Sequence, residues 1–156
     1  MAPHVALLLG TLHWISPSSR RVIVLLGAYC KLSADLLART IGMRNRYQLA
    51  RVLALDGLPP LQELRTWVRL ISWMLEWDRA RISLYQSATR QDLEPATCYR
   101  AIKKATGVTW KEVRAGGVAG ALLKLREKCR APADVERTAS QKTRGAVPSD
   151  PRQRQA

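Results

Sequence analysis

Two stretches of equal length and similar layout decide the fold of this chain: SADLLARTIGMRNRYQLARVLALDG at residues 33–57, and SLYQSATRQDLEPATCYRAIKKATG at residues 83–107. A shift of 50 residues lays one on the other. The shift pairs Ser33 with Ser83, Ala38 with Ala88, Leu49 with Tyr99, Val52 with Ile102 and Gly57 with Gly107. Serine is a preferred helix N-cap, so each stretch is expected to open with a short helix. The matches are individually weak, but their order predicts a repeated structural unit.

Within each stretch, small and turn-forming residues stand where a pair of crossing helices needs them. Ala38 and Ala88 allow the first helix to approach the second closely, and Gly42 or Asp92 occupies the turn. A turn of this kind needs a left-handed backbone, which glycine adopts readily and aspartate less well. The second helix then places apolar residues on one side and polar residues on the other. This layout predicts two helix-turn-helix units in tandem.

The segment between the two stretches predicts a long helix. Leu61–Trp77 contains no helix breaker, and its large apolar residues recur at three- and four-residue spacing, which is typical of an amphipathic helix. Its tryptophans are expected in the core. Further helices are expected at Arg20–Tyr29, Ala34–Ile41, Arg46–Leu55, 83–88, Ala96–Ala105, Trp110–Ala115 and Val118–Cys129, with a break at Gly116-Gly117. The fold class is therefore predicted to be all-α, with two helix-turn-helix subdomains joined by a linker helix.

Four regions follow from this pattern. Residues 1–16 form a short apolar segment, expected to be a strand or a partner-facing element, or the remnant of a larger domain. Residues 17–115 hold the tandem units, and residues 116–130 a C-terminal helix. Residues 131–156 are rich in Pro, Ser, Gln, Arg and Gly with few large apolar side chains, so a disordered basic tail is expected.

Charge indicates an anionic partner. The chain has 156 residues, with 26 Lys and Arg against 12 Asp and Glu, a formal net charge of +14. Residues 31–115 alone hold 15 basic and 8 acidic side chains, so the excess is not confined to the tail. A basic surface of this kind attracts nucleic acid or an anionic membrane. The simpler alternative is that the charge only keeps the chain soluble.

Several classes of protein are disfavoured. Cys30, Cys98 and Cys129 are far apart in sequence and odd in number, which is typical neither of a disulfide framework nor of a zinc site and suits a reducing, cytoplasmic compartment. His4 and His13 lack acidic or cysteine neighbours, so no metal is expected. The apolar N-terminal run is too short to span a membrane and has no basic residue before it. No nucleophile–base pair or phosphate loop is visible, so neither an enzyme nor a bound cofactor is expected.

The stretch Glu94–Gly107, followed by VTWKEVR at residues 108–114, resembles the second recognition helix and closing motif of the AraC/XylS family of transcriptional regulators. The resemblance covers about residues 20–114. It implies two DNA-binding units on one long helix and a cytoplasmic, nucleoid-associated regulator that binds double-stranded DNA, with RNA polymerase as a further candidate partner. The chain departs from the family at residues 43–48, where the turn is one residue out of the commonest spacing, and it lacks the large effector domain of many members.

The candidate DNA-binding residues are polar and mostly basic, and they differ between the two units. The first unit offers Arg44, Asn45, Arg46, Tyr47, Gln48 and Arg51, and the second offers Thr97, Arg100, Lys103 and Lys104. Arginine can bond guanine through two donors, and Asn or Gln can do the same for adenine. Glu94 in the second unit would repel phosphate unless it meets a cytosine amine. We therefore expect the first unit to read bases and the second to anchor on phosphate.

Other interpretations stay open for these residues. Each side chain could contact phosphate or solvent rather than a base, and the units could instead dock another protein or RNA. Arginines outside the recognition helices could add phosphate contacts, although a solvated face explains them equally well, and basic residues of the tail could add sequence-independent attraction. These are Arg65, Arg69, Arg79 and Arg81, and in the tail Arg137, Lys142, Arg144, Arg152 and Arg154.

Overall fold

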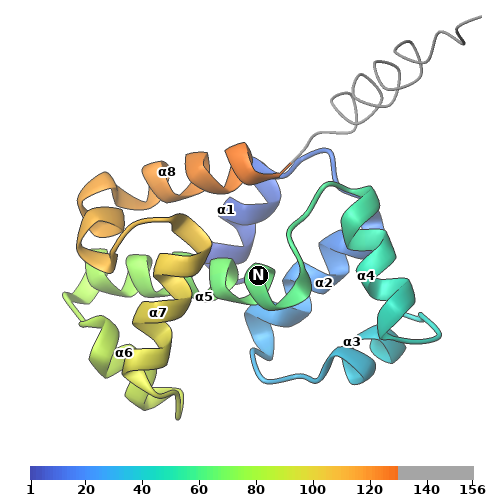
Figure 1. The fold of residues 1–156 in the computed structure, drawn as a ribbon, viewed down its shortest axis with the longest axis horizontal. Coiled ribbons are helices and arrows are strands. Elements are labelled where there is room, and N and C mark those ends of the chain that lie inside the picture. The colour runs from blue at the N-terminus through green and yellow to red at the C-terminus, as the bar shows by residue number, and fades with distance from the viewer. Residues whose placement is uncertain (130–156) are drawn as a thin grey trace, which may run out of the picture.

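The computed structural model describes residues 1–129, and these form eight α-helices without a strand. The helices are α1 (Pro3–Thr11), α2 (Pro17–Ala28), α3 (Ala34–Thr40), α4 (Arg46–Leu55), α5 (Leu61–Ala80), α6 (Leu84–Arg90), α7 (Pro95–Thr106) and α8 (Trp110–Lys128). The all-α class is confirmed. Figure 1 shows α3 and α4 on one side of the molecule and α6 and α7 on the other, with α5 running between them. The predicted tail, residues 131–156, lies outside the described residues.

Helix α5 lies at the centre of the hydrophobic core. It packs against α1, α2, α6, α7 and α8. Trp67, Leu70 and Ile71 are fully buried, and Trp73 and Met74 nearly so. Each large apolar side chain removed from water stabilises the fold by about 1.5–3 kcal/mol. The helix predicted at Leu61–Trp77 is thus confirmed and extends to Ala80. Trp67 and Trp73 belong to the core as expected, whereas Trp77 is only half-buried and has the guanidinium groups of Arg81 and Arg114 near its ring.

The N-terminal segment is a helix rather than the expected strand. Pro3 occupies the first turn of α1, where a proline costs no hydrogen bond. Val5, Leu8 and Leu12 are buried on the side facing α2 and α5. Their spacing of three and four residues is helical, but in so short an apolar run it does not by itself exclude a strand. α1 lies so close to α2 that a Cβ at Gly27 would stand 2.2 Å from Cγ2 of Val5.

The first helices and turns of the two repeated units match as predicted. The hydroxyl oxygens of Ser33 and Ser83 each accept an N–H from the first turn of the following helix. Ala38 and Ala88 are fully buried, and the backbone carbonyl of each accepts an N–H from beyond the turn, at 2.8 and 2.9 Å. Gly42 adopts a φ of 81° and Asp92 a φ of 51°, both left-handed. Aspartate therefore takes the glycine conformation at this turn.

The second helices match with a shift of 49 residues, not 50. Asn45 and Glu94 are the N-caps of α4 and α7, so the turn of the first unit holds one more residue. Leu49 consequently corresponds to Cys98, and both are buried. The predicted pairing of Leu49 with Tyr99 was wrong, because Tyr99 is 41% exposed. The extra residue in the first turn therefore changes by one position which residues of α4 correspond to those of α7.

The last helix contains the break expected at its glycine pair. Within α8, Gly117 has φ 68° and ψ 177°, which no α-helix accommodates. Before the break, Thr109 caps the helix by accepting the N–H of Glu112, and the Glu112 carboxylate accepts the N–H of Thr109. After it, Ala121 and Leu125 are buried again. The second half of α8 therefore still covers the core.

Gly42 generates a stability prediction. Replacing it with alanine places a Cβ on a left-handed residue, so Gly42→Ala should lower the free energy of unfolding by about 1–2 kcal/mol. The matched control is Gly10→Ala in α1, where an added Cβ meets nothing within 4 Å. Gly10→Ala should leave the stability unchanged or raise it by up to about 1 kcal/mol. Urea unfolding measures both. Equal unfolding midpoints for Gly42→Ala and the wild type would show that the turn is not constrained in this way.

Candidate nucleic-acid interface

The N-terminal turn of α4 forms an exposed polar surface, which we call the α4 edge. It consists of Arg44, Asn45, Arg46, Tyr47, Gln48 and Arg51, all of them exposed. The Asn45 side-chain oxygen caps the helix by accepting the backbone N–H groups of Tyr47 and Gln48 at 3.1 and 3.0 Å. Gln48 in turn accepts the backbone N–H of Arg44 at 2.9 Å. The acceptors of Asn45 and Gln48 are thus used to fix the turn, so neither side chain is set for two-bond pairing with adenine.

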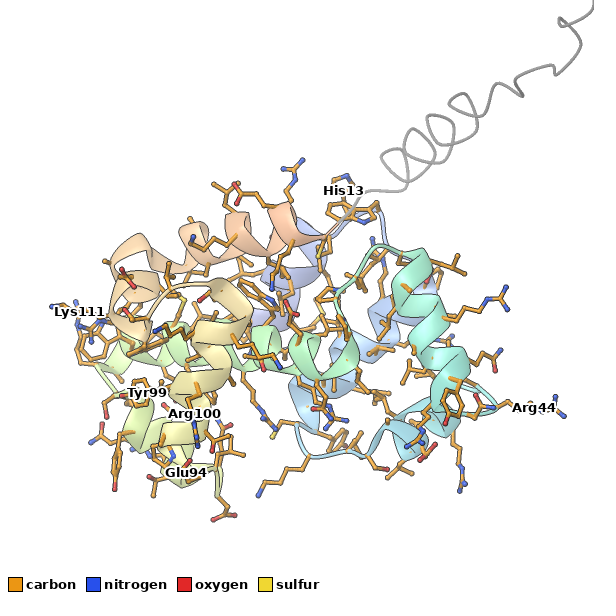
Figure 2. All side chains as sticks on the ribbon, viewed as in Figure 1. His13, Arg44, Glu94, Tyr99, Arg100 and Lys111 are labelled. Atoms are coloured by element: carbon orange, nitrogen blue, oxygen red, sulfur yellow. The ribbon has the colours of Figure 1, made fainter. Side chains whose placement is uncertain are left out.

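The arginines of the α4 edge are the groups left free to reach a partner. The Arg46 guanidinium donates to the Tyr47 hydroxyl at 3.2 Å and lies 5.1 Å from the centre of the tyrosine ring. This hydrogen bond raises the pKa of Arg46, so the charge is secure. Figure 2 shows Arg44 pointing away from the body of the protein. The α4 edge therefore presents three exposed arginines near the capped start of the helix: Arg44 before the cap, Arg46 in the first turn and Arg51 in the second.

The N-terminus of α7 differs because an acid caps it. The Glu94 carboxylate accepts the N–H of Ala96 at 3.0 Å and that of Thr97 at 2.6 Å, together with the Thr97 hydroxyl. The hydrogen bonds from Thr97 and Ala96, with the nearby Arg100, lower the pKa of Glu94. An ionised carboxylate at this end partly neutralises the positive helix terminus that would otherwise attract an anion.

Arg100 is held along α7 by the same cluster. Its guanidinium donates to the Thr97 hydroxyl at 3.2 Å and lies 3.8 Å from the Glu94 carboxylate. Figure 2 shows Glu94 and Arg100 on the same side of α7. The predicted residues Thr97 and Arg100 are thus brought together with Glu94, and Lys103 and Lys104 are exposed about a turn further along. The basic groups of α7 lie along the helix rather than at its tip.

Two arginines of α5 that were expected to contact phosphate or solvent, Arg65 and Arg69, bind backbone carbonyls of the protein instead. Arg65 is only 9% exposed and donates to the carbonyl of Leu32. Burial lowers the pKa of its guanidinium. Arg69 donates to the carbonyl of Cys30 at 2.9 Å. Both groups therefore bind the loop between α2 and α3 and hold it against α5, because buried carbonyls need donors.

Sequence reasoning missed one charged contact between the two units. Lys31, in the loop before α3, lies 3.4 Å from the carboxylate of Asp92 in the turn between α6 and α7. The two residues are 61 positions apart, so no local pattern could reveal the contact. Both side chains are largely exposed, and such a pair adds little stability. It does show that the loop before α3 and the second turn are neighbours.

The closing motif at residues 106–114 has a structural explanation at each position. Gly107 ends α7 with a φ of 78°, and Thr109 and Glu112 cap α8. Trp110 and Val113 are buried. The Arg114 guanidinium stacks 4.1 Å from the ring centre of Trp77 on α5. The motif therefore serves to dock α7 and α8 on the central helix.

Comparison with protein-family models, curated proteins and solved structures finds no match to this chain. Within residues 1–129, no group of three or more His, Cys, Asp or Glu is placed to hold a metal ion. In the same part of the chain, none of the helices combines the length and apolar character needed to cross a bilayer. Function therefore has to be argued from the surfaces themselves.

The capping acids generate a prediction on pH. The pKa values of Glu94 and Glu112 are lowered in the folded protein by hydrogen bonds, chiefly with Thr97 and Thr109 respectively. A carboxyl with a lowered pKa stabilises the fold above its unfolded pKa of about 4.3, and this contribution is lost as the pH falls through the folded value. The double variant Glu94→Gln, Glu112→Gln should therefore lose less stability than the wild type on acidification.

Urea unfolding between about pH 6 and pH 3 measures this difference, because the slope of stability against pH reports the protons taken up. The matched control is Glu127→Gln, which changes an exposed acid of α8. It should retain the pH slope of the wild type. A double variant with the slope of the wild type would contradict the proposed role of the two caps.

Proposed function

We propose that this protein is a sequence-specific, DNA-binding regulator of transcription that acts in the cytoplasm. The observation that carries the proposal is the α4 edge, where three exposed arginines lie along the N-terminal half of a capped helix: Arg44 just before the cap, Arg46 at the first helical position and Arg51 in the second turn. The N-terminal end of a recognition helix is the part that contacts base edges in the major groove. The basic charge of the chain supports the proposal, since neutralising phosphates supplies much of the affinity for DNA.

The repeated architecture supports a two-site mode of binding. α4 and α7 each follow a short helix and a left-handed turn, and their units lie on either side of α5. Two such helices on one rigid support can enter successive major grooves, about 34 Å apart. The resemblance of residues 94–114 to the AraC/XylS family supports the same arrangement. RNA polymerase remains a candidate partner in this proposal.

The two units are proposed to have different tasks. Arg44 and Arg46 can each bond O6 and N7 of guanine, so the first unit reads sequence. In the second unit the capping carboxylate of Glu94 repels phosphate at the helix tip, and Arg100 is partly occupied by it. Lys103 and Lys104 remain free on the exposed side of α7. The second unit therefore anchors the protein on the DNA backbone.

An adaptor that docks another protein, or an RNA, is the second candidate. It is favoured by large apolar side chains that are exposed around the first unit: Leu36 on α3 is 50% exposed, Tyr47 69% and Leu55 67%. Aromatic residues and arginine are both common in the centres of protein interfaces. Loss of binding to a partner protein on changing Leu36 or Leu55, with DNA binding intact, would distinguish this function.

The test is selection of bound sequences from random duplex DNA, using the whole chain. The wild type should enrich a motif, and Arg44→Ala with Arg46→Ala should relax it at guanine positions, since each lost two-bond contact removes about 1–3 kcal/mol of discrimination. The matched control, Arg21→Ala with Arg126→Ala, removes the same charge from exposed sites on α2 and α8.

A second pair of variants separates reading from anchoring. Lys103→Ala with Lys104→Ala should weaken binding to all sequences, lower its salt dependence and leave the motif unchanged. No enriched motif with the wild type would overturn the proposal of sequence-specific binding. A motif that survives in the Arg44 and Arg46 variant would show that other residues read the bases.

A further inference from the structure

A cleft lies between α5 and α7. Its outer part has a volume of about 500 Å³ and is lined from α5 by Gln62, Thr66 and Arg69 and from α7 by Lys104 and Ala105. A recess of about 130 Å³ adjoins it, with Trp73, Leu93 and Cys98 in its wall. Thr66, Arg69 and Ala101 line both parts, so they form one continuous space. Its total size falls in the range typical of small-molecule sites.

Two buried donors beside the recess have no acceptor. Among the described residues, neither Nε1 of Trp73 nor Nε of Arg69 has a hydrogen-bond partner. Trp73 is only 2% exposed, so solvent does not compensate its N–H. Buried polar groups are nearly always paired in folded proteins, and an unpaired pair of donors at one recess calls for an explanation. Because both residues line the recess, an oxygen of a ligand bound there is a source of the missing acceptor.

The remaining lining indicates the kind of ligand. Leu93, Ala101 and the ring of Trp73 are apolar, and burial raises the pKa of the Cys98 thiol, so that it stays neutral. A cavity of about 150 Å³ holds a benzene-sized molecule, so the recess suits an apolar group of roughly six carbons.

The charged groups along the cleft favour an anionic end on that ligand. The acids are Glu63, which is paired with Lys128, and Glu94, which caps α7. Arg69 and Lys104 are the basic groups of the lining. Since Arg69 stands where the recess meets the outer cleft, an anionic group would lie at that junction.

We propose that this cleft binds a small carboxylate whose apolar body fills the recess and whose carboxylate accepts from Arg69 and Trp73. Both donor atoms are covered by the surrounding side chains, so this binding mode requires the side chains around the recess to move. The site uses none of the residues of the α4 edge. It does share Thr97 and Lys104 of α7 with the proposed contacts to DNA. The ligand is therefore titrated without DNA, so that failure of this proposal and failure of the proposed function are distinguishable.

The test is a titration of the full chain with cyclohexanecarboxylate, followed by the indole N–H resonances in nuclear magnetic resonance spectra. Trp73→Phe, which keeps an aromatic ring in the recess, assigns the resonance of Trp73. That resonance should move in a saturable manner, together with backbone amides of residues 66–73 and 97–105. The neutral amide of the same ring, cyclohexanecarboxamide, should bind about tenfold more weakly, because hydrogen bonds to a charged acceptor are stronger.

Two variants test the position of the site. Ala101→Met fills the cleft and should abolish saturation, whereas Ala119→Met, at an exposed alanine of α8, should bind as the wild type does. If Ala101→Met fails to fold, Thr66→Val replaces it in the test. This variant alters the lining of the cleft without adding bulk, and it should weaken binding. Absence of saturation with the wild type, or unchanged binding by a folded Ala101→Met, would overturn the proposal. Inorganic phosphate moving the Trp73 resonance as strongly would also overturn it, by showing a general contact for anions such as the DNA backbone.

Discussion

The arrangement of the whole molecule depends on the burial of α5. Helix α5 places Trp67, Leu70 and Ile71 in the core and is covered by helices from both ends of the described chain. A helix buried on several sides cannot rotate or slide without exposing large apolar side chains to water. The elements that pack on it therefore keep fixed positions, and this fixes the separation of the two outer helix pairs.

The two pairs are connected to α5 in different ways. The second pair packs on α5 directly through α6 and α7. The first pair is connected less directly: Arg65 and Arg69 of α5 bind the loop before α3, whereas α4 packs on α2, where the Asp56 carboxylate at the end of α4 accepts the N–H of Ser16 at 2.9 Å. Polar contacts of this kind specify a geometry, since buried donors and acceptors must meet their partners. The two units also differ in their N-caps, a neutral Asn45 on α4 and a charged Glu94 on α7, and the proposed division of tasks rests on this difference.

The local features of this fold could be predicted from the sequence, because they rest on residues a few positions apart. The serine caps of α3 and α6, the turns at Gly42 and Asp92 and the break at Gly117 are all confirmed. The register of the second helices was not predicted, since one extra residue in a turn leaves the flanking patterns intact. The helix at the N-terminus was missed because a short apolar run fits either period.

For the candidate interface, too, the sequence predicted which residues are polar and exposed but not which partners they bind. The polar residues of the α4 edge were predicted as candidates, and all of them are exposed. The engagement of Asn45 and Gln48 with the backbone was not predicted, because the sequence shows donors and acceptors but not which are already used. Arg65 and Arg69 were expected either to contact phosphate or to lie on a solvated face. Their carbonyl partners lie more than thirty residues away in sequence.

The central claim is that α4 and α7 bind the same DNA duplex as two recognition helices, held at a fixed separation by α5. Hydroxyl-radical footprinting on the selected DNA tests it most directly. The account predicts two protected tracts on one face of the duplex, with centres about 10–10.5 base pairs apart, the repeat of successive major grooves. A single protected tract, or two tracts at a spacing that places them on opposite faces, would contradict it.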